Sequence, residues 1–294
     1  MRTKNNIVTV LFVVGMASVA SAAVTAYEAF DYTVGLEHLR DVSPWVAPTT
    51  QTPHEDFDVY AGSLGYTDGL AQSLVTGGNS AGRRDKGIPP DTSNRSDVES
   101  TLNAATQALF TATQSIYVSL LWQSGSGAVG FRNKNVGPGW TGGFHLDTDK
   151  NYWGPGFKLT ASDIDGVGSA SNTGTQATWD FSPARFYVLK IDNVAGGNET
   201  ISAIFDPTDL TTEPSWATPD MQVTGIDIGT PDKLWLYVWP ETSYGDGANH
   251  TRTGLHIDEI RIGTSWADVT PIPEPATLSV LGIGCVLALL RRRR

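Results

Sequence analysis

Two short acidic segments carry the oxygen-bearing side chains that a calcium ion prefers. One contains Asp147, Asp149 and Asn151 at alternate positions, and the other contains Asp163 and Asp165. Alternating oxygen ligands are typical of calcium loops. The same side chains also cap turns without any metal. The sequence therefore leaves Ca²⁺ binding open at both segments and indicates no other cofactor.

The carboxylates do not show the pairing that glycoside hydrolysis needs. Retaining enzymes place two carboxyl groups about 5 Å apart. The nearest candidate is Asp258-Glu259, and adjacent side chains of a regular strand point to opposite faces. No histidine pair has zinc-ligand spacing, and no serine stands in a nucleophile elbow. We therefore predict no catalytic residue and no enzyme, and a divergent glycoside hydrolase remains the alternative if two carboxylates do face each other.

Several tryptophans could bind sugar. Exposed aromatic rings in loops offer flat surfaces to pyranose faces. Packing is the alternative for each of them, and Trp122 and Trp235 lie in apolar runs that indicate core positions. The candidates near Gly or Pro are Trp45, Trp140, Trp153 and Trp216.

Short strands must position these residues. β-branched and aromatic residues gather in runs separated by turns rich in Gly, Asn, Asp and Ser, which is the pattern of a sandwich or barrel. A shift of alternation at residues 258–259 predicts a bulge in the last run. A short helix is expected within 98–110, capped by Ser96 or Asp97. The runs are residues 116–122, 185–191, 201–205, 234–239 and 255–262.

The N-terminal end has the three parts of a secretory signal peptide. Arg2 and Lys4 precede an apolar run from Ile7 to Val14, and small residues follow up to Ala22. We expect cleavage after Ala22, so the signal peptide spans residues 1–22.

The C-terminal end has a distinct order of parts. Pro273, Glu274 and Pro275 precede an uncharged segment at 276–290, which we expect to enter the membrane as a helix. The terminal arginines should stay on the cytoplasmic side, which leaves the body outside. They are Arg291, Arg292, Arg293 and Arg294.

This order of motif, apolar segment and arginine run resembles the PEP-CTERM sorting signal of Gram-negative bacteria, over residues 271–294. The resemblance implies recognition by an exosortase, a membrane protease-transferase. It also implies passage through the inner membrane to the cell surface or extracellular matrix. A plain membrane anchor is the alternative.

The body, residues 23–270, resembles the LamG-like jelly-roll domain of the concanavalin A-like superfamily. The residues that carry the resemblance are 27–32, 116–122 and 257–263. It implies an all-β jelly-roll sandwich whose first and last strands pair and bring Phe30 near Ile260.

Composition narrows the function classes. The net charge is −11, and the body is more negative once the basic ends are set aside, so nucleic acid is excluded as a partner. The single cysteine, Cys285, lies in the apolar tail, so the body has no disulfide. We expect a non-enzymatic surface or matrix protein. The alternative is a carbohydrate-binding module for matrix polysaccharide.

Overall fold

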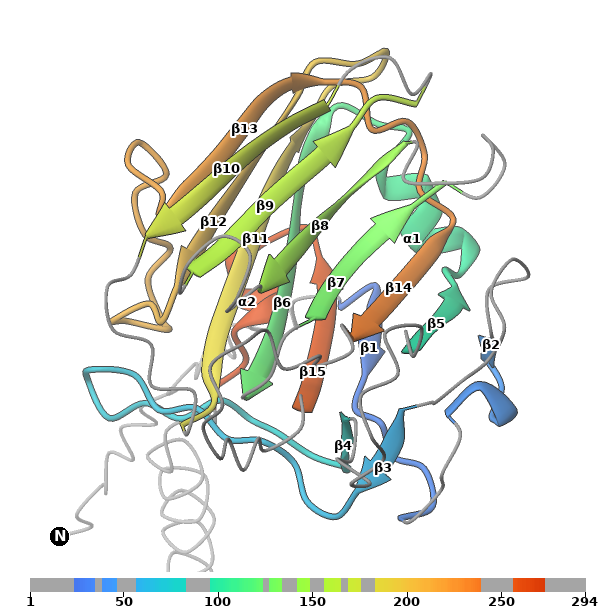
Figure 1. Ribbon diagram of the computed structural model, residues 1–294. Helices are drawn as coiled ribbons and strands as arrows, with labels where there is room; N and C mark the ends of the chain where they lie inside the picture. Colours follow the sequence, from blue (N-terminus) through green and yellow to red (C-terminus); the bar gives the residue numbers. More distant parts are fainter. Residues whose placement is uncertain are drawn as a thin grey trace, which may run out of the picture.

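The computed structural model describes residues 24–34, 39–46, 57–82, 96–123, 127–133, 142–148, 156–164, 169–175, 183–238 and 256–272. The expected signal peptide and the segment after Ile272 lie outside these ranges. Within them the chain forms two antiparallel sheets that pack face to face (Figure 1). No helix in the described part is long and apolar enough to cross a membrane. The membrane helix expected at 276–290 is not covered by that finding.

The first sheet has eight strands in the order β13-β12-β11-β6-β15-β4-β3, with β1 paired beside β15. Its centre is formed by the long strands that the sequence predicted most clearly. The strands are β1 (Ala26–Glu28), β3 (Asp58–Tyr60), β4 (Ser80–Gly82), β6 (Gln114–Gln123), β11 (Arg185–Asn193), β12 (Glu199–Phe205), β13 (Met221–Ile226) and β15 (His256–Gly263).

The second sheet has seven strands in the order β10-β9-β8-β7-β14-β5-β2. In Figure 1 its strands form the layer in front of β6, β11 and β15. They are β2 (Trp45–Val46), β5 (Ser96–Thr101), β7 (Gly127–Arg132), β8 (Gly143–Thr148), β9 (Gly156–Ser162), β10 (Ser169–Thr175) and β14 (Lys233–Val238).

The main core lies between the sheets and follows the alternation of the strands. Leu234 and Leu236 of β14 point inward with Val129 and Phe131 of β7, and each is at most 5% exposed. Because side chains alternate along a strand, the residues between them lie on the outer face of the second sheet. The all-β sandwich expected from the sequence is therefore confirmed.

Two local predictions have different outcomes. The bulge in the last run is confirmed, because the register of β15 against β6 shifts between Asp258 and Arg261. The helix near residue 100 was misplaced at its start. Residues 96–101 form β5, and α1 (Ala104–Leu109) begins after Asn103, whose side chain accepts a hydrogen bond from Thr106 N. Neither Ser96 nor Asp97 is its cap.

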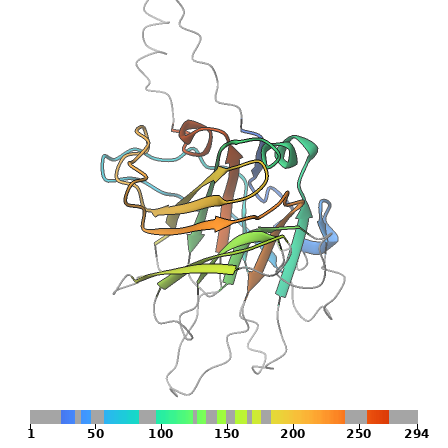
Figure 2. The same cartoon turned by 90° about the horizontal axis from the view of Figure 1, so that it is seen from above.

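The first and last strands pair, as the resemblance implied. Ala26 lies opposite Ile262, and Glu28 rather than Phe30 lies opposite Ile260. Phe30 and Ile260 still belong to the same buried core cluster. The start of β1 and the C-terminal helix α2 (Trp266–Val269) consequently lie at the same end of the body (Figure 2).

A long connection between β3 and β4, residues 61–79, crosses the outer face of the first sheet, and we call it the strap. It covers a second apolar cluster in which Leu74 packs with Leu121, Phe186 and Trp266. A short 3-10 helix, η1 (Leu39–Asp41), precedes β2 of the second sheet. The strap is the element that covers the most polar part of β15.

Candidate functional site

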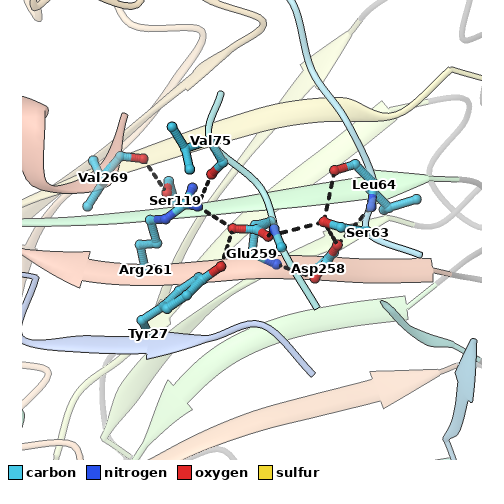
Figure 3. Close-up of polar contacts among 10 residues, drawn as sticks. Tyr27, Ser63, Leu64, Val75, Ser119, Asp258, Glu259, Arg261 and Val269 are labelled. Atoms are coloured by element: carbon cyan, nitrogen blue, oxygen red, sulfur yellow. Dashed lines mark hydrogen bonds and ion pairs between the residues drawn. The ribbon is translucent and has the colours of Figure 1, made fainter. Parts of the chain in front are cut away.

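The bulge in β15 brings two buried carboxylates together. Glu259 has a φ of 57°, a left-handed conformation that turns its side chain to the same side as that of Asp258. Ser63 Oγ of the strap lies 2.5 Å from Asp258 Oδ2 and 3.1 Å from Glu259 Oε1 (Figure 3). The expectation that these adjacent side chains cannot converge is therefore wrong, since it assumed a regular strand.

Backbone donors of the strap complete the site around these carboxylates. Leu64 N donates to Asp258 Oδ2 at 2.8 Å, and Gly77 N donates to Glu259 Oε1 at 2.6 Å. The pair thus holds both ends of the strap segment 63–77 against β15. Glu259 Oε2 accepts from the Tyr27 hydroxyl at 2.9 Å and forms an ion pair with Arg261.

The hydroxyl of Ser63 has one proton but three acceptors within reach. They are Asp258 Oδ2, Glu259 Oε1 and Leu64 O. A proton on Asp258 satisfies this cluster, because Asp258 and Ser63 can then each donate one hydrogen bond. Burial, with a smaller contribution from the negative charge of Glu259, raises the pKa of Asp258 to about 7.

The geometry assigns this pair a structural task. Asp258 and Glu259 are each 0% exposed. Each of their four carboxylate oxygens already has a hydrogen-bond partner or an ion-pair partner. A polysaccharide could bring a glycosidic bond to these carboxylates only by displacing the strap. We therefore describe the pair as a latch for the strap.

A second polar arrangement lies on the outer face of the second sheet. Gly130 of β7 stands in register between Trp235 of β14 and His145 of β8. Because glycine has no side chain, the two rings meet across it, with centroids 6.2 Å apart and nearly perpendicular planes. Tyr237 stacks on Trp235 from two residues along the same strand, with centroids 5.2 Å apart.

Charged groups complete this arrangement, which we call the outer-face cluster (Glu99, Arg132, His145, Trp235, Tyr237). The Arg132 guanidinium lies 5.7 Å from the Trp235 ring centroid and forms an ion pair with Glu99. Glu99 is 0% exposed, and Trp235 and Tyr237 are each 3% exposed. Burial, together with the positive charge of Lys158, lowers the pKa of His145 to about 4, so the imidazole is neutral at pH 7.

The predicted calcium segments are only partly within the described residues. Asp147 lies in β8 on the outer face, in register with Lys158, and is 7% exposed. Asp163 Oδ1 accepts a hydrogen bond from Asp227 N at 2.8 Å. Within the described part of the chain, no three His, Cys, Asp or Glu side chains gather as a metal site. Asp149, Asn151 and Asp165 lie outside it, so calcium stays a prediction.

The predicted sugar-binding tryptophans are not brought together by the structure. Trp45 is 1% exposed, stacks on Phe30 at 5.8 Å and donates its Nε1–H to the Tyr32 hydroxyl, so it offers no free face. This corrects its placement in an exposed loop, because β2 pairs with β5 and turns the ring into the core. Trp140 and Trp153 lie outside the described residues.

Trp216 is half-buried and packs over the second apolar cluster. Its ring meets Tyr117 and Trp266 edge-on at 6.3 and 6.4 Å, and its Nε1–H donates to Glu213 at 2.7 Å. Lys190 Nζ lies 5.8 Å from its ring centroid. Packing is therefore the main role that the structure gives Trp216.

Sequence reasoning missed the outer-face cluster. Trp235 was expected in the core; it is buried, but in a separate cluster with Ala128 and Tyr237. The available signal was the alternation of β14, in which Leu234 and Leu236 take the inward positions. A glycine in the middle of β7 was a second signal, since it marks a close approach.

Comparison with known proteins identifies the C-terminal segment. Residues 271–294 match the PEP-CTERM protein-sorting motif, so the chain carries this signal as the sequence indicated. The motif implies export through the membrane to the cell surface and processing by an exosortase-type membrane protease. No curated protein sequence matches the chain.

Several solved structures resemble the chain at low sequence identity. An endo-β-1,4-glucuronan lyase from the fungus Trichoderma reesei has 13% identity and a TM-score of 0.47, covering 86% of this chain and 100% of the lyase. A Bacillus licheniformis β-glucanase has 14% identity and a TM-score of 0.40, covering 82% of this chain and 98% of the glucanase. A β-glucanase described as putative, from Mycobacterium abscessus, has 12% identity and a TM-score of 0.41, covering 82% and 100%. At this similarity the activities of these enzymes say nothing about this chain.

Proposed function

We propose that this protein is a non-enzymatic component of the cell surface or extracellular matrix, delivered there by exosortase-type sorting. The observation that carries the proposal is the sorting motif at 271–294. It follows directly on a β-sandwich whose last strand and α2 are packed into the body. In this proposal the motif directs sorting, and the β-sandwich body is the part that reaches the surface or matrix.

The chemistry of the described carboxylates supports a non-enzymatic body. Asp258 and Glu259, which converge at the bulge of β15, are buried under the strap, with all four oxygens engaged. On the opposite sheet, the Glu99 carboxylate is neutralised by Arg132. A retaining glycosidase needs two accessible carboxyl groups about 5 Å apart, one of them free to take up a proton.

The sorting half of the proposal is tested with a motif variant in the native host. A triple change, Pro273→Ala, Glu274→Ala and Pro275→Ala, is compared with the wild type by cell fractionation. We expect the wild type at the surface or in the matrix and the variant in the inner membrane. The same distribution for both proteins would show that the motif does not direct sorting.

The alternative function, a carbohydrate-binding module for matrix polysaccharide, gains no support from the outer-face cluster. Trp235 and Tyr237 are each 3% exposed, so neither ring offers a free face to a sugar.

A further inference from the structure

The chain leaves the folded body at a defined place. Ile272, the last described residue, packs against the apolar cluster beneath the strap. The preceding carbonyl, Pro271 O, accepts a hydrogen bond from Val75 N of the strap at 2.8 Å. The body is therefore fixed up to Ile272, the residue immediately before Pro273.

Only a short stretch of chain connects Ile272 to the apolar segment. Three residues, 273–275, separate Ile272 from the apolar segment that begins at Ala276. An extended chain advances at most about 3.6 Å per residue, so Ile272 lies within about 14 Å of Ala276. One headgroup layer is about 5–8 Å thick. If the segment 276–290 enters the bilayer, Ile272 therefore lies within the lipid headgroup layer or at most about 9 Å beyond it.

Exposed apolar side chains lie close to the exit point. Tyr27, Val75 and Val24 are 50%, 46% and 39% exposed, and they are among the most exposed large apolar residues of the described chain. The Arg261 guanidinium joins two of them, because it lies 4.9 Å from the Tyr27 ring centroid and donates to Val75 O (Figure 3). Val24 precedes Thr25, whose N–H donates to Ile262 O at 2.8 Å. We call these three residues the exit surface.

The charge beneath the exit surface is compensated. Arg261 is 3% exposed and is paired with Glu259, so the two charges cancel close to their source. The Tyr27 hydroxyl donates to the buried Glu259 carboxylate, so the half-exposed ring presents mainly apolar atoms at this surface. A neutral, apolar surface with such a residue fits a lipid interface better than it fits water.

We propose that the exit surface lies on the lipid headgroup layer while the precursor is held by its C-terminal segment, before sorting removes the body. The inference rests on the proposed sorting function, because it requires the tail to be in the membrane. The contact orients the body so that the bonds around 273–275 stay close to the membrane plane, where a membrane protease acts.

The test places a fluorophore on the exit surface of the full-length precursor. Cys285→Ala first removes the native thiol, and Val75→Cys is then labelled with nitrobenzoxadiazole. Val46→Cys is the matched control, since Val46 is also 46% exposed but lies on the edge strand β2 of the other sheet. Val24→Cys supplies a second position on the exit surface if the first variant folds poorly. Vesicles of phosphatidylethanolamine and phosphatidylglycerol carry nitroxide-labelled headgroups, and flotation measures membrane association separately.

We expect the precursor to float with the vesicles and the probe at position 75 or 24 to be quenched at least threefold more than the probe at 46. Equal quenching at the exit surface and at 46 in floating precursor would overturn the inference and leave the anchor intact. Failure of the precursor to float would overturn the membrane anchoring itself, and the proposed contact with it.

Discussion

The latch between β15 and the strap predicts an unusual dependence of stability on pH. In the folded protein the pKa of Asp258 is raised from 3.8 to about 7, chiefly by burial. The folded state therefore holds this proton more tightly than the unfolded chain does. The resulting stabilisation is complete below about pH 4 and is lost as the pH rises through about 7.

The size of this effect follows from the two pKa values. At about 1.36 kcal/mol per pH unit, the change from 3.8 to about 7 is worth at most about 4 kcal/mol in the free energy of unfolding. Ser63 of the strap contacts both Asp258 and Glu259. Tyr27 of β1 and Arg261 of β15 contact Glu259. Ionised Asp258 would face Glu259 with only one hydroxyl proton between them.

The perturbation that isolates this effect is Asp258→Asn, which has no titrating proton. The amide cannot accept from both Leu64 N and Glu259 N, so we expect a loss of about 1–3 kcal/mol at pH 4.5. Between pH 4.5 and pH 8.5, however, the variant should lose less stability than the wild type. The difference between the two losses should be about 3 kcal/mol, because about 2.5 pH units separate pH 4.5 from the folded-state pKa of about 7.

The assay is urea-induced unfolding followed by tryptophan fluorescence at both pH values. Asn79→Ala is the control, because it removes two hydrogen bonds of the strap, to Gly62 N and Tyr32 O, without removing a titrating group. It should lower stability equally at both pH values. If Asp258→Asn loses as much stability on going to pH 8.5 as the wild type does, the assignment of the proton to this latch is refuted.

Three further predictions concern the outer-face cluster. Glu99→Gln should destabilise the fold by about 3–5 kcal/mol in thermal unfolding, because it strands a largely buried guanidinium, whereas Lys190→Gln should cost less than about 1 kcal/mol. Similar losses would contradict the buried pair. His145 should titrate near pH 4 by NMR, and a midpoint near 6.5 would show that its ring is solvated. Gly130→Ala should lower the free energy of unfolding by about 1–3 kcal/mol, because the new Cβ would lie 2.5 Å from a backbone carbonyl oxygen. Gly65→Ala is the control and should be nearly neutral, since a Cβ there meets nothing within 4 Å. Equal stability of the two variants would refute the close approach.

The strand framework could be predicted because its signal is local. Runs such as 116–122 and 185–191 combine β-branched and aromatic residues and become the paired central strands β6 and β11. The bulge in β15 was also predicted from sequence, since alternation breaks at the acidic pair. The start of the helix expected within 98–110 could not be predicted from local preference. Residues 96–101 form a strand because they pair with β14.

The site-level geometry could not be predicted, because it depends on contacts between distant segments. The convergence of Asp258 and Glu259 requires the left-handed φ of Glu259 and donors from the strap almost 200 residues earlier. The burial of Trp45 results from the pairing of β2 with β5. These relationships leave no periodic trace in the sequence.

The most direct test of the account is the intact mass of the protein recovered from the surface or matrix of its native host. We predict a mature form that lacks the residues before Ala23 and has lost Arg291 to Arg294 with the apolar segment. A surface form that retains the terminal arginines would contradict exosortase-type processing and reduce residues 276–290 to an anchor.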